Sequence, residues 1–158
     1  MKKIFIALMF SFGFLSSCNP KDQPLDKVVN LQNAGGIPIA KVKINGKEIY
    51  VIMDTGASIS VIDEKSSRSL GFNVFDDPES TGIAGYGGTN VMRLTDIHEI
   101  ELDGYTINGD FKTQNLTNII TAIKNNTGFE ITGIVGMNFM RTYDFAINFT
   151  NNTISFNP

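Results

Sequence analysis

The most informative stretch of the sequence is YVIMDTGAS, residues 50–58, in which a run of apolar residues leads directly into an acidic one. The apolar run is typical of a buried β-strand, so the carboxylate of Asp54 is expected to be partly buried at its end. Burial of a carboxylate costs free energy unless hydrogen bonds replace the lost water. Thr55, Gly56 and Ser58 supply hydroxyl and backbone N–H groups for this purpose. Asp54 is therefore a candidate for general acid–base chemistry.

Hairpin signals surround this stretch and recur later in the chain. Residues 37–44 alternate in polarity, Asn45-Gly46 is a strong two-residue turn signal, and residues 47–53 return as a second strand. Two further hairpins are predicted in the same way, one in residues 97–111 and one in residues 143–156. The chain is therefore expected to be all-β.

Two segments carry helical signals instead. Residues 63–70 begin with an acidic N-cap residue and are followed by Gly71, which is a common helix terminator. Residues 117–125 place isoleucines at helical spacing. The sequence thus predicts one or two short helices beside the strands.

Composition excludes several classes of function. The 158 residues suit one domain, and 13 basic against 16 acidic side chains leave a net charge of −3 with no basic cluster. Nucleic acid is therefore not an expected partner, because phosphate contacts need Lys and Arg. A single Cys and a single His exclude a disulfide framework and a Cys/His zinc site. His98 is expected at the surface, and no metal or organic cofactor is expected.

The N-terminal residues have the layout of a secretory signal peptide, with two lysines, an apolar run over 4–15 and two serines. The sequence LSSC at 15–18 resembles the lipobox of bacterial lipoproteins. That resemblance implies cleavage after residue 17 and lipidation of Cys18. Residues 19–26 are polar and include two prolines, so residues 18–27 are expected to hold the lipidated Cys and a flexible tether. The folded domain, residues 28–158, would then be anchored to a membrane of the bacterial cell envelope and face the periplasm or the exterior. An ordinary signal peptide with a chance cysteine and a buried core segment are the alternatives.

The segment DTGAS, residues 54–58, resembles the active-site loop of retropepsin-like aspartic proteases. Two later segments extend this resemblance: GIAGYGGT at 82–89 is similar to the flap hairpin, and GIVGMNFM at 133–140 is similar to the second family signature, in which a glycine precedes a short helix. The resemblance covers roughly residues 28–156. It implies a retropepsin-like closed barrel and an aspartic endopeptidase that hydrolyses peptide or protein substrates.

The mechanism of that family needs two carboxylates that share a proton. The chain contains one Asp-Thr-Gly, so the resemblance implies a homodimer in which each protomer contributes Asp54. It further implies that Thr55 bonds across the dimer axis, that the Gly56 N–H approaches the carboxylate and that Ser58 bonds its outer oxygen. The same resemblance places four residues at the flap tip over the substrate: Gly85, Tyr86, Gly87 and Gly88.

Other interpretations remain open at this stage. Asp54-Thr55-Gly56 is also an ordinary turn sequence, and residues 82–88 are rich in glycine as phosphate-binding loops are, although they lack the Gly-Lys-Ser/Thr ending. The domain could keep the fold as a catalytically inactive module that binds peptides or proteins, or as a structural lipoprotein. The intact set of Asp54, Thr55, Gly56 and Ser58 favours the enzyme.

Overall fold

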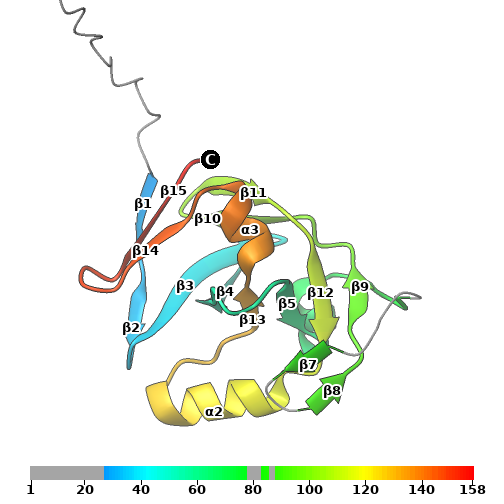
Figure 1. The fold of residues 1–158 in the computed structure, drawn as a ribbon. Coiled ribbons are helices and arrows are strands. Elements are labelled where there is room, and N and C mark those ends of the chain that lie inside the picture. Colours follow the sequence, from blue (N-terminus) through cyan, green and yellow to red (C-terminus); the bar gives the residue numbers. More distant parts are fainter. Residues whose placement is uncertain (1–26, 78–82, 86–87) are drawn as a thin grey trace, which may run out of the picture.

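A computed structural model describes residues 27–77, 83–85 and 88–158 (Figure 1). The predicted signal peptide, the lipidation site Cys18 and residues 18–26 of the predicted tether lie outside the described residues, as do Tyr86 and Gly87.

Strands make up most of the regular structure. In chain order the strands are β1 (Lys27–Asn30), β2 (Gln32–Ala34), β3 (Ile37–Ile44), β4 (Lys47–Met53), β5 (Ser60–Asp63), β6 (Val74–Phe75), β7 (Ile83–Gly85), β8 (Gly88–Asn90), β9 (Arg93–Thr95), β10 (Glu99–Leu102), β11 (Tyr105–Asn108), β12 (Phe111–Gln114), β13 (Gly133–Val135), β14 (Ala146–Asn148) and β15 (Thr153–Phe156). The helical elements are a 3₁₀ turn η1 (Glu64–Ser66) and the α-helices α1 (Ser67–Leu70), α2 (Thr117–Thr127) and α3 (Met137–Thr142).

The three predicted hairpins are confirmed. In β3–β4 the turn residues Asn45 and Gly46 have φ angles of 50° and 74°, the left-handed values that a tight two-residue turn requires. β10–β11 turns in the same way at Asp103 and Gly104, with φ angles of 50° and 84°. The last hairpin pairs β14 with β15, and Asn152 in its turn has a φ of 51°.

The described strands form one ten-stranded sheet, a three-stranded sheet of order β1-β15-β14 and the two-stranded β7–β8 ribbon. The large sheet follows the order β11-β10-β3-β4-β13-β5-β12-β9-β6, with β2 added to β3. It curls into a half-barrel around the main apolar core (Figure 1). Among the described residues, the largest fully buried side chains are Phe111, Phe139, Phe156, Ile39, Ile44, Ile62, Ile100, Leu102, Ile107, Leu116, Ile131 and Ile154.

One insertion in this sheet positions the candidate site. β13 lies between β4 and β5, parallel to the first, with Val135 opposite Met53, and antiparallel to the second, with Gly133 opposite Ile62. The segment that leaves β13 is therefore held next to the loop that joins β4 to β5. This arrangement brings together residues that are about eighty positions apart in the sequence.

Both predicted helices are present. The segment 63–70 folds as η1 followed by α1, which ends at Gly71 with a φ of 77°. The segment 117–125 lies within α2, which continues to Thr127 and ends at Gly128 with a φ of 79°. The third helix, α3, follows Gly136, where the resemblance places a short helix. None of the helices in the described part of the chain has the length and apolar character needed to cross a membrane.

Candidate active site

The loop that follows β4 holds Asp54 in a fixed conformation. Its backbone N–H donates a hydrogen bond to the carbonyl of Val135 at 2.9 Å, and the N–H of Ala57 donates to the Asp54 carbonyl at 3.2 Å. Met53 directly before it is buried, whereas Asp54 is half-buried and Thr55 is exposed. The chain therefore emerges from the core at Asp54 and turns at the surface, as the sequence predicts.

The carboxylate of Asp54 has a partner within its own loop. The backbone N–H of Gly56 donates a hydrogen bond to Asp54 Oδ1 at 2.8 Å. A Cβ on Gly56 would lie 3.1 Å from that oxygen, which is tighter than ordinary van der Waals contact. Glycine is therefore the residue that gives the N–H close access to the carboxylate, and the predicted role of Gly56 is present in the structure.

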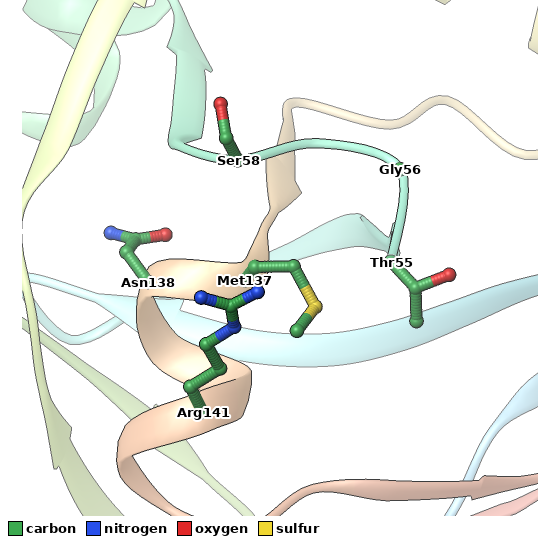
Figure 2. A pocket seen from close by; sticks show the side chains of 6 residues that line it. All are labelled: Thr55, Gly56, Ser58, Met137, Asn138 and Arg141. Atoms are coloured by element: carbon green, nitrogen blue, oxygen red, sulfur yellow. The ribbon is translucent and has the colours of Figure 1, made fainter.

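Ser58 behaves differently from the expectation. The resemblance implied that its hydroxyl bonds the outer oxygen of Asp54, but no hydrogen bond joins these two described residues. The side chain of Ser58 is exposed, and in Figure 2 it points away from Thr55 and Gly56. The loop turns between positions 56 and 58, which separates the hydroxyl from the carboxylate.

Two polar residues that the sequence did not single out, Ser60 and Asn138, join the loop region to the start of α3. The buried hydroxyl of Ser60 accepts a hydrogen bond from the Gly136 N–H at 2.8 Å and donates to Asn138 Oδ1 at 2.7 Å. Asn138 Nδ2 in turn donates to the carbonyl of Asp110 at 2.9 Å. The available signal in the sequence was a serine at the start of the otherwise apolar run SVI, which becomes the buried strand β5. A buried hydroxyl needs a hydrogen-bond partner. Nothing in the sequence identified Asn138 as that partner.

Gly136 fixes how closely α3 approaches the loop. A Cβ at this position would lie 2.7 Å from the carbonyl oxygen of Ala57 and 2.8 Å from that of Ile59. The next residue, Met137, donates its N–H to the Ala57 carbonyl at 2.8 Å. The loop and the start of α3 are therefore in direct backbone contact, and a larger residue than glycine does not fit between them.

A cleft of about 330 Å³ lies between the loop and α3 (Figure 2). The loop contributes Thr55, Gly56 and Ser58, while the helix contributes Met137, Asn138 and Arg141. Thr55, Ser58 and Arg141 are exposed, and Arg141 is the one charged residue among the six that line the cleft. The neighbourhood of Asp54 thus offers one carboxylate, one cation and several hydrogen-bonding groups.

The segment that resembles the flap hairpin forms a short two-stranded ribbon in its described residues. β7 and β8 pair antiparallel, with Gly85 opposite Gly88 at the end of the ladder. The tip residues Tyr86 and Gly87, which the resemblance places over the substrate, lie outside the described residues.

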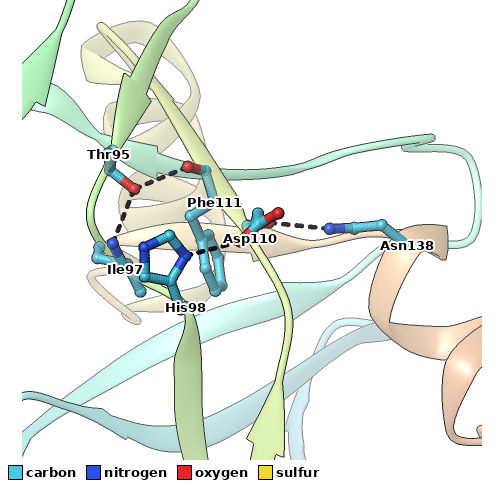
Figure 3. Close-up of polar contacts among 6 residues, drawn as sticks. All are labelled: Thr95, Ile97, His98, Asp110, Phe111 and Asn138. Atoms are coloured by element: carbon cyan, nitrogen blue, oxygen red, sulfur yellow. Dashed lines mark hydrogen bonds and ion pairs between the residues drawn. The ribbon is translucent and has the colours of Figure 1, made fainter.

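His98 lies at the surface, as the sequence predicts, with a side chain that is 71% exposed. Its Nδ1 is 2.8 Å from Asp110 Oδ1, and the Asp110 backbone accepts the hydrogen bond from Asn138 (Figure 3). Nearby, the buried hydroxyl of Thr95 donates to the Phe111 carbonyl at 2.7 Å. His98 is therefore linked through Asp110 to Asn138 on α3 and does not line the cleft. Among the described residues, no group of three or more His, Cys, Asp or Glu side chains is arranged to hold a metal ion.

Comparison with known proteins agrees with this geometry. A family model described as aspartyl protease matches residues 40–139, which include the Asp54 loop, Ser60 and the start of α3. The chain belongs to the aspartyl protease family. The predicted all-β class is confirmed for this family member, since its described residues form mostly strands, with a large sheet that curls into a half-barrel and few short helices.

Two solved structures similar to this aspartyl protease family member are both proteases. A retropepsin-like aspartic protease from Rickettsia conorii is 15% identical with a TM-score of 0.49, over 83% of this chain and 92% of that one. EIAV protease in complex with the inhibitor HBY-793 is 22% identical with a TM-score of 0.47, over 70% of this chain and 91% of that one. No curated protein sequence matches the chain.

Proposed function

We propose that this family member is an aspartic endopeptidase whose active site forms when two copies of the chain bring their Asp54 loops together. The observation that carries the proposal is the Asp54 loop. The carboxylate of the half-buried Asp54 accepts a hydrogen bond from the Gly56 N–H, and the loop backbone is hydrogen-bonded to β13 and to the start of α3. The match of the family model across this loop supports it further.

A second copy is needed because the chemistry uses two carboxylates. The sequence contains a single Asp-Thr-Gly, so one protomer supplies half of the pair. A two-fold axis is the simplest closed assembly that would place the two Asp54 side chains against each other. Two carboxylates about 3 Å apart do not both ionise readily, so the pair would hold one proton between them and titrate as a unit.

The shared proton assigns a role to each carboxyl group. The ionised Asp54 would act as general base and remove a proton from a water molecule between the two groups. The resulting hydroxide would attack the carbonyl carbon of the scissile peptide bond, while the protonated Asp54 of the other copy donates a hydrogen bond to the carbonyl oxygen. Collapse of the tetrahedral intermediate would break the C–N bond, and the leaving amine would take up a proton from the pair.

A peptide digest tests this activity directly. Residues 19–158 and the Asp54→Asn variant would be incubated with a diverse peptide mixture from about pH 4 to about pH 7, the range in which a shared-proton carboxyl pair is expected to work. Mass spectrometry would identify the products. We expect cleavage by the wild type and none by the variant.

Asp103→Asn is the matched control, because Asp103 is an exposed turn residue with a positive φ that asparagine also tolerates. It should cleave like the wild type. If neither the folded wild type nor the folded Asp54→Asn variant cleaves any peptide, the proposal is contradicted. That result would favour the alternative, an inactive module that binds peptides or proteins.

We also propose that the protein is lipid-anchored through Cys18 in a bacterial cell envelope. The LSSC sequence at 15–18 supports this, and the described domain begins at Lys27, nine positions later. A coil of about ten residues spans roughly 17 Å, which would keep the protease close to the membrane surface. Metabolic labelling with a fatty acid should mark the wild type and not a Cys18→Ala variant. Labelling of both would contradict the anchor.

A further inference from the structure

Arg141 is the cation of the cleft beside the Asp54 loop. Its guanidinium group lies beside Met137 and below the segment that joins Gly56 to Ser58 (Figure 2). The six residues that line this cleft include no Asp or Glu. The cleft therefore carries a positive charge that its own walls do not neutralise.

Most other cations of the described chain have a partner. Five form ion pairs, as with Lys43 and Glu101 at 2.6 Å or Arg93 and Glu64 at 2.6 Å. Lys27 lies 5.3 Å from the centre of the Tyr105 ring, and Lys47 and Lys65 donate to oxygen atoms. Within residues 27–77, 83–85 and 88–158, Arg141 and Arg68 alone have no such contact. Arg68 lies on α1 and does not line the cleft.

The chemistry of the cleft favours a carboxylate as its ligand. A guanidinium group binds a carboxylate through two parallel N–H···O hydrogen bonds, which gives geometric specificity as well as attraction. The other five residues that line the cleft are uncharged, so an anion bound there would meet Arg141 as its one charged contact within the cleft.

The cleft also lies within reach of a peptide bound at Asp54. Successive Cα atoms are 3.8 Å apart, so Ser58 is at most about 15 Å from Asp54 along the chain. An extended peptide advances about 3.3 Å per residue. A side chain within about four residues of the scissile bond would therefore reach as far as Ser58, which is one of the residues that line the cleft.

We propose that Arg141 determines substrate specificity by binding an acidic side chain of the peptide within about four residues of the scissile bond. This inference rests on the proposed endopeptidase function and names a substrate class for it. The preference arises from charge, so it concerns Glu against its uncharged isostere Gln and not the size of the side chain.

Paired peptides measure this preference. Each pair differs only by Glu or Gln at one position on either side of a known cleavage site, and kcat/KM is compared within the pair. At one or more positions, the wild type should favour Glu by about fivefold, near the upper end for a solvent-exposed ion pair. Arg141→Met, which keeps an unbranched apolar stem, should bring the ratio close to one, and Arg141→Glu should favour Gln. Arg68→Met, the matched control, should keep the wild-type ratio.

A binding readout separates this inference from the proposed function. The Asp54→Asn variant, with and without Arg141→Met, would be titrated against the same fluorescent peptides by anisotropy. A Glu preference that disappears with Arg141→Met supports the inference even if the wild type cleaves nothing.

Two results would overturn the inference. The first is an equal Glu/Gln ratio in the wild type and Arg141→Met at every position. The second is a weakened dimer in Arg141→Met, measured by sedimentation, with an unchanged Glu/Gln ratio in the remaining dimer. In that case the guanidinium group contacts an acidic group of the second copy and not the substrate.

Discussion

The helices α2 and α3 differ in how they pack against the rest of the domain. α2 has 11 residues and α3 has six, and they lie at opposite ends of β13 (Figure 1). The longer helix has no buried residue and packs through partly buried isoleucines such as Ile123. The shorter helix buries Phe139 and Met140. The short helix is therefore the one that is built into the core.

Polar contacts show the same contrast. The start of α3 contacts the Asp54 loop through the Met137 N–H and through the bonds that join Gly136, Ser60 and Asn138. The start of α2 is held by a hydrogen bond from the Leu116 N–H to Asp63 Oδ1, on the strand that leads away from the loop. The shorter helix therefore supports the Asp54 loop through close backbone contact and satisfied buried polar groups. A helix that only covers a sheet needs apolar contact.

The largest expected difference concerns core packing. Phe139 is fully buried and its ring centre lies 5.1 Å from that of Phe111. Phe139→Ala should therefore lower the free energy of unfolding by about 3–5 kcal/mol, the usual cost of truncating a buried aromatic side chain. Ile123→Ala on α2 should cost about 1 kcal/mol, because the side chain is only partly buried. Urea unfolding monitored by circular dichroism measures both. Equal losses would remove the distinction between the helices.

The next largest loss of stability is expected from substitution of the glycines that flank the two helices, Gly136 before α3 and Gly128 after α2. Gly136→Ala places a Cβ within 2.8 Å of two carbonyl oxygens, so it should cost about 3 kcal/mol and reduce activity through displacement of the loop. Gly128→Ala, just after α2, meets no atom within 4 Å but has a φ of 79°. It should cost about 1 kcal/mol, from backbone strain alone, and leave kcat/KM unchanged. If Gly128→Ala were the more damaging change, close backbone contact would not be what distinguishes α3.

Removal of one hydroxyl tests the polar contacts. Ser60→Ala leaves the buried Gly136 N–H without its acceptor, so we expect a loss of about 1–3 kcal/mol in unfolding free energy together with lower kcat. Thr127→Ala on α2 removes a hydrogen bond to the Ile123 carbonyl that lies far from the loop in the sequence. That control should lose about 1 kcal/mol or less and keep its kcat. An unchanged kcat in Ser60→Ala would show that the loop does not depend on this network.

The smallest expected effect comes from a carboxylate on neither helix. The Asn73 backbone N–H and side chain donate to Asp96 at 2.8 and 2.7 Å, and the pKa of Asp96 is lowered from its usual 3.8 chiefly by the backbone hydrogen bond. A lowered folded-state pKa contributes stability above pH 3.8 that is lost as the pH falls through the folded value. The stability difference between wild type and Asp96→Ala should therefore shrink from about pH 5 to about pH 3. A difference that grows with acid would contradict this sign.

Local features of the fold were predictable from the sequence, because their physics is local. Asn45-Gly46 and Asp103-Gly104 adopt positive φ angles that few other residue pairs tolerate. Each pair therefore determines a hairpin turn independently of the rest of the fold. The contact from Gly56 to Asp54 spans two residues and follows from the same reasoning.

Long-range features were not predictable in this way. Ser60 and Asn138 are 78 positions apart, and only the insertion of β13 between β4 and β5 brings them together. The cleft at Arg141 depends on that same insertion, because it lies between the Asp54 loop and α3, which follows β13. No periodicity or turn signal in one sequence reports which strands become neighbours in a sheet.

The central claim is that one functional site requires Asp54 from two copies, and subunit mixing tests it most directly. Wild type and Asp54→Asn would be mixed at constant total concentration, allowed to exchange, and assayed on one peptide substrate. If both carboxylates are needed, activity follows the square of the wild-type fraction, so an equal mixture keeps about a quarter of the wild-type rate. Activity proportional to the wild-type fraction, with about half remaining in the equal mixture, would contradict the claim and place a complete site in a single chain.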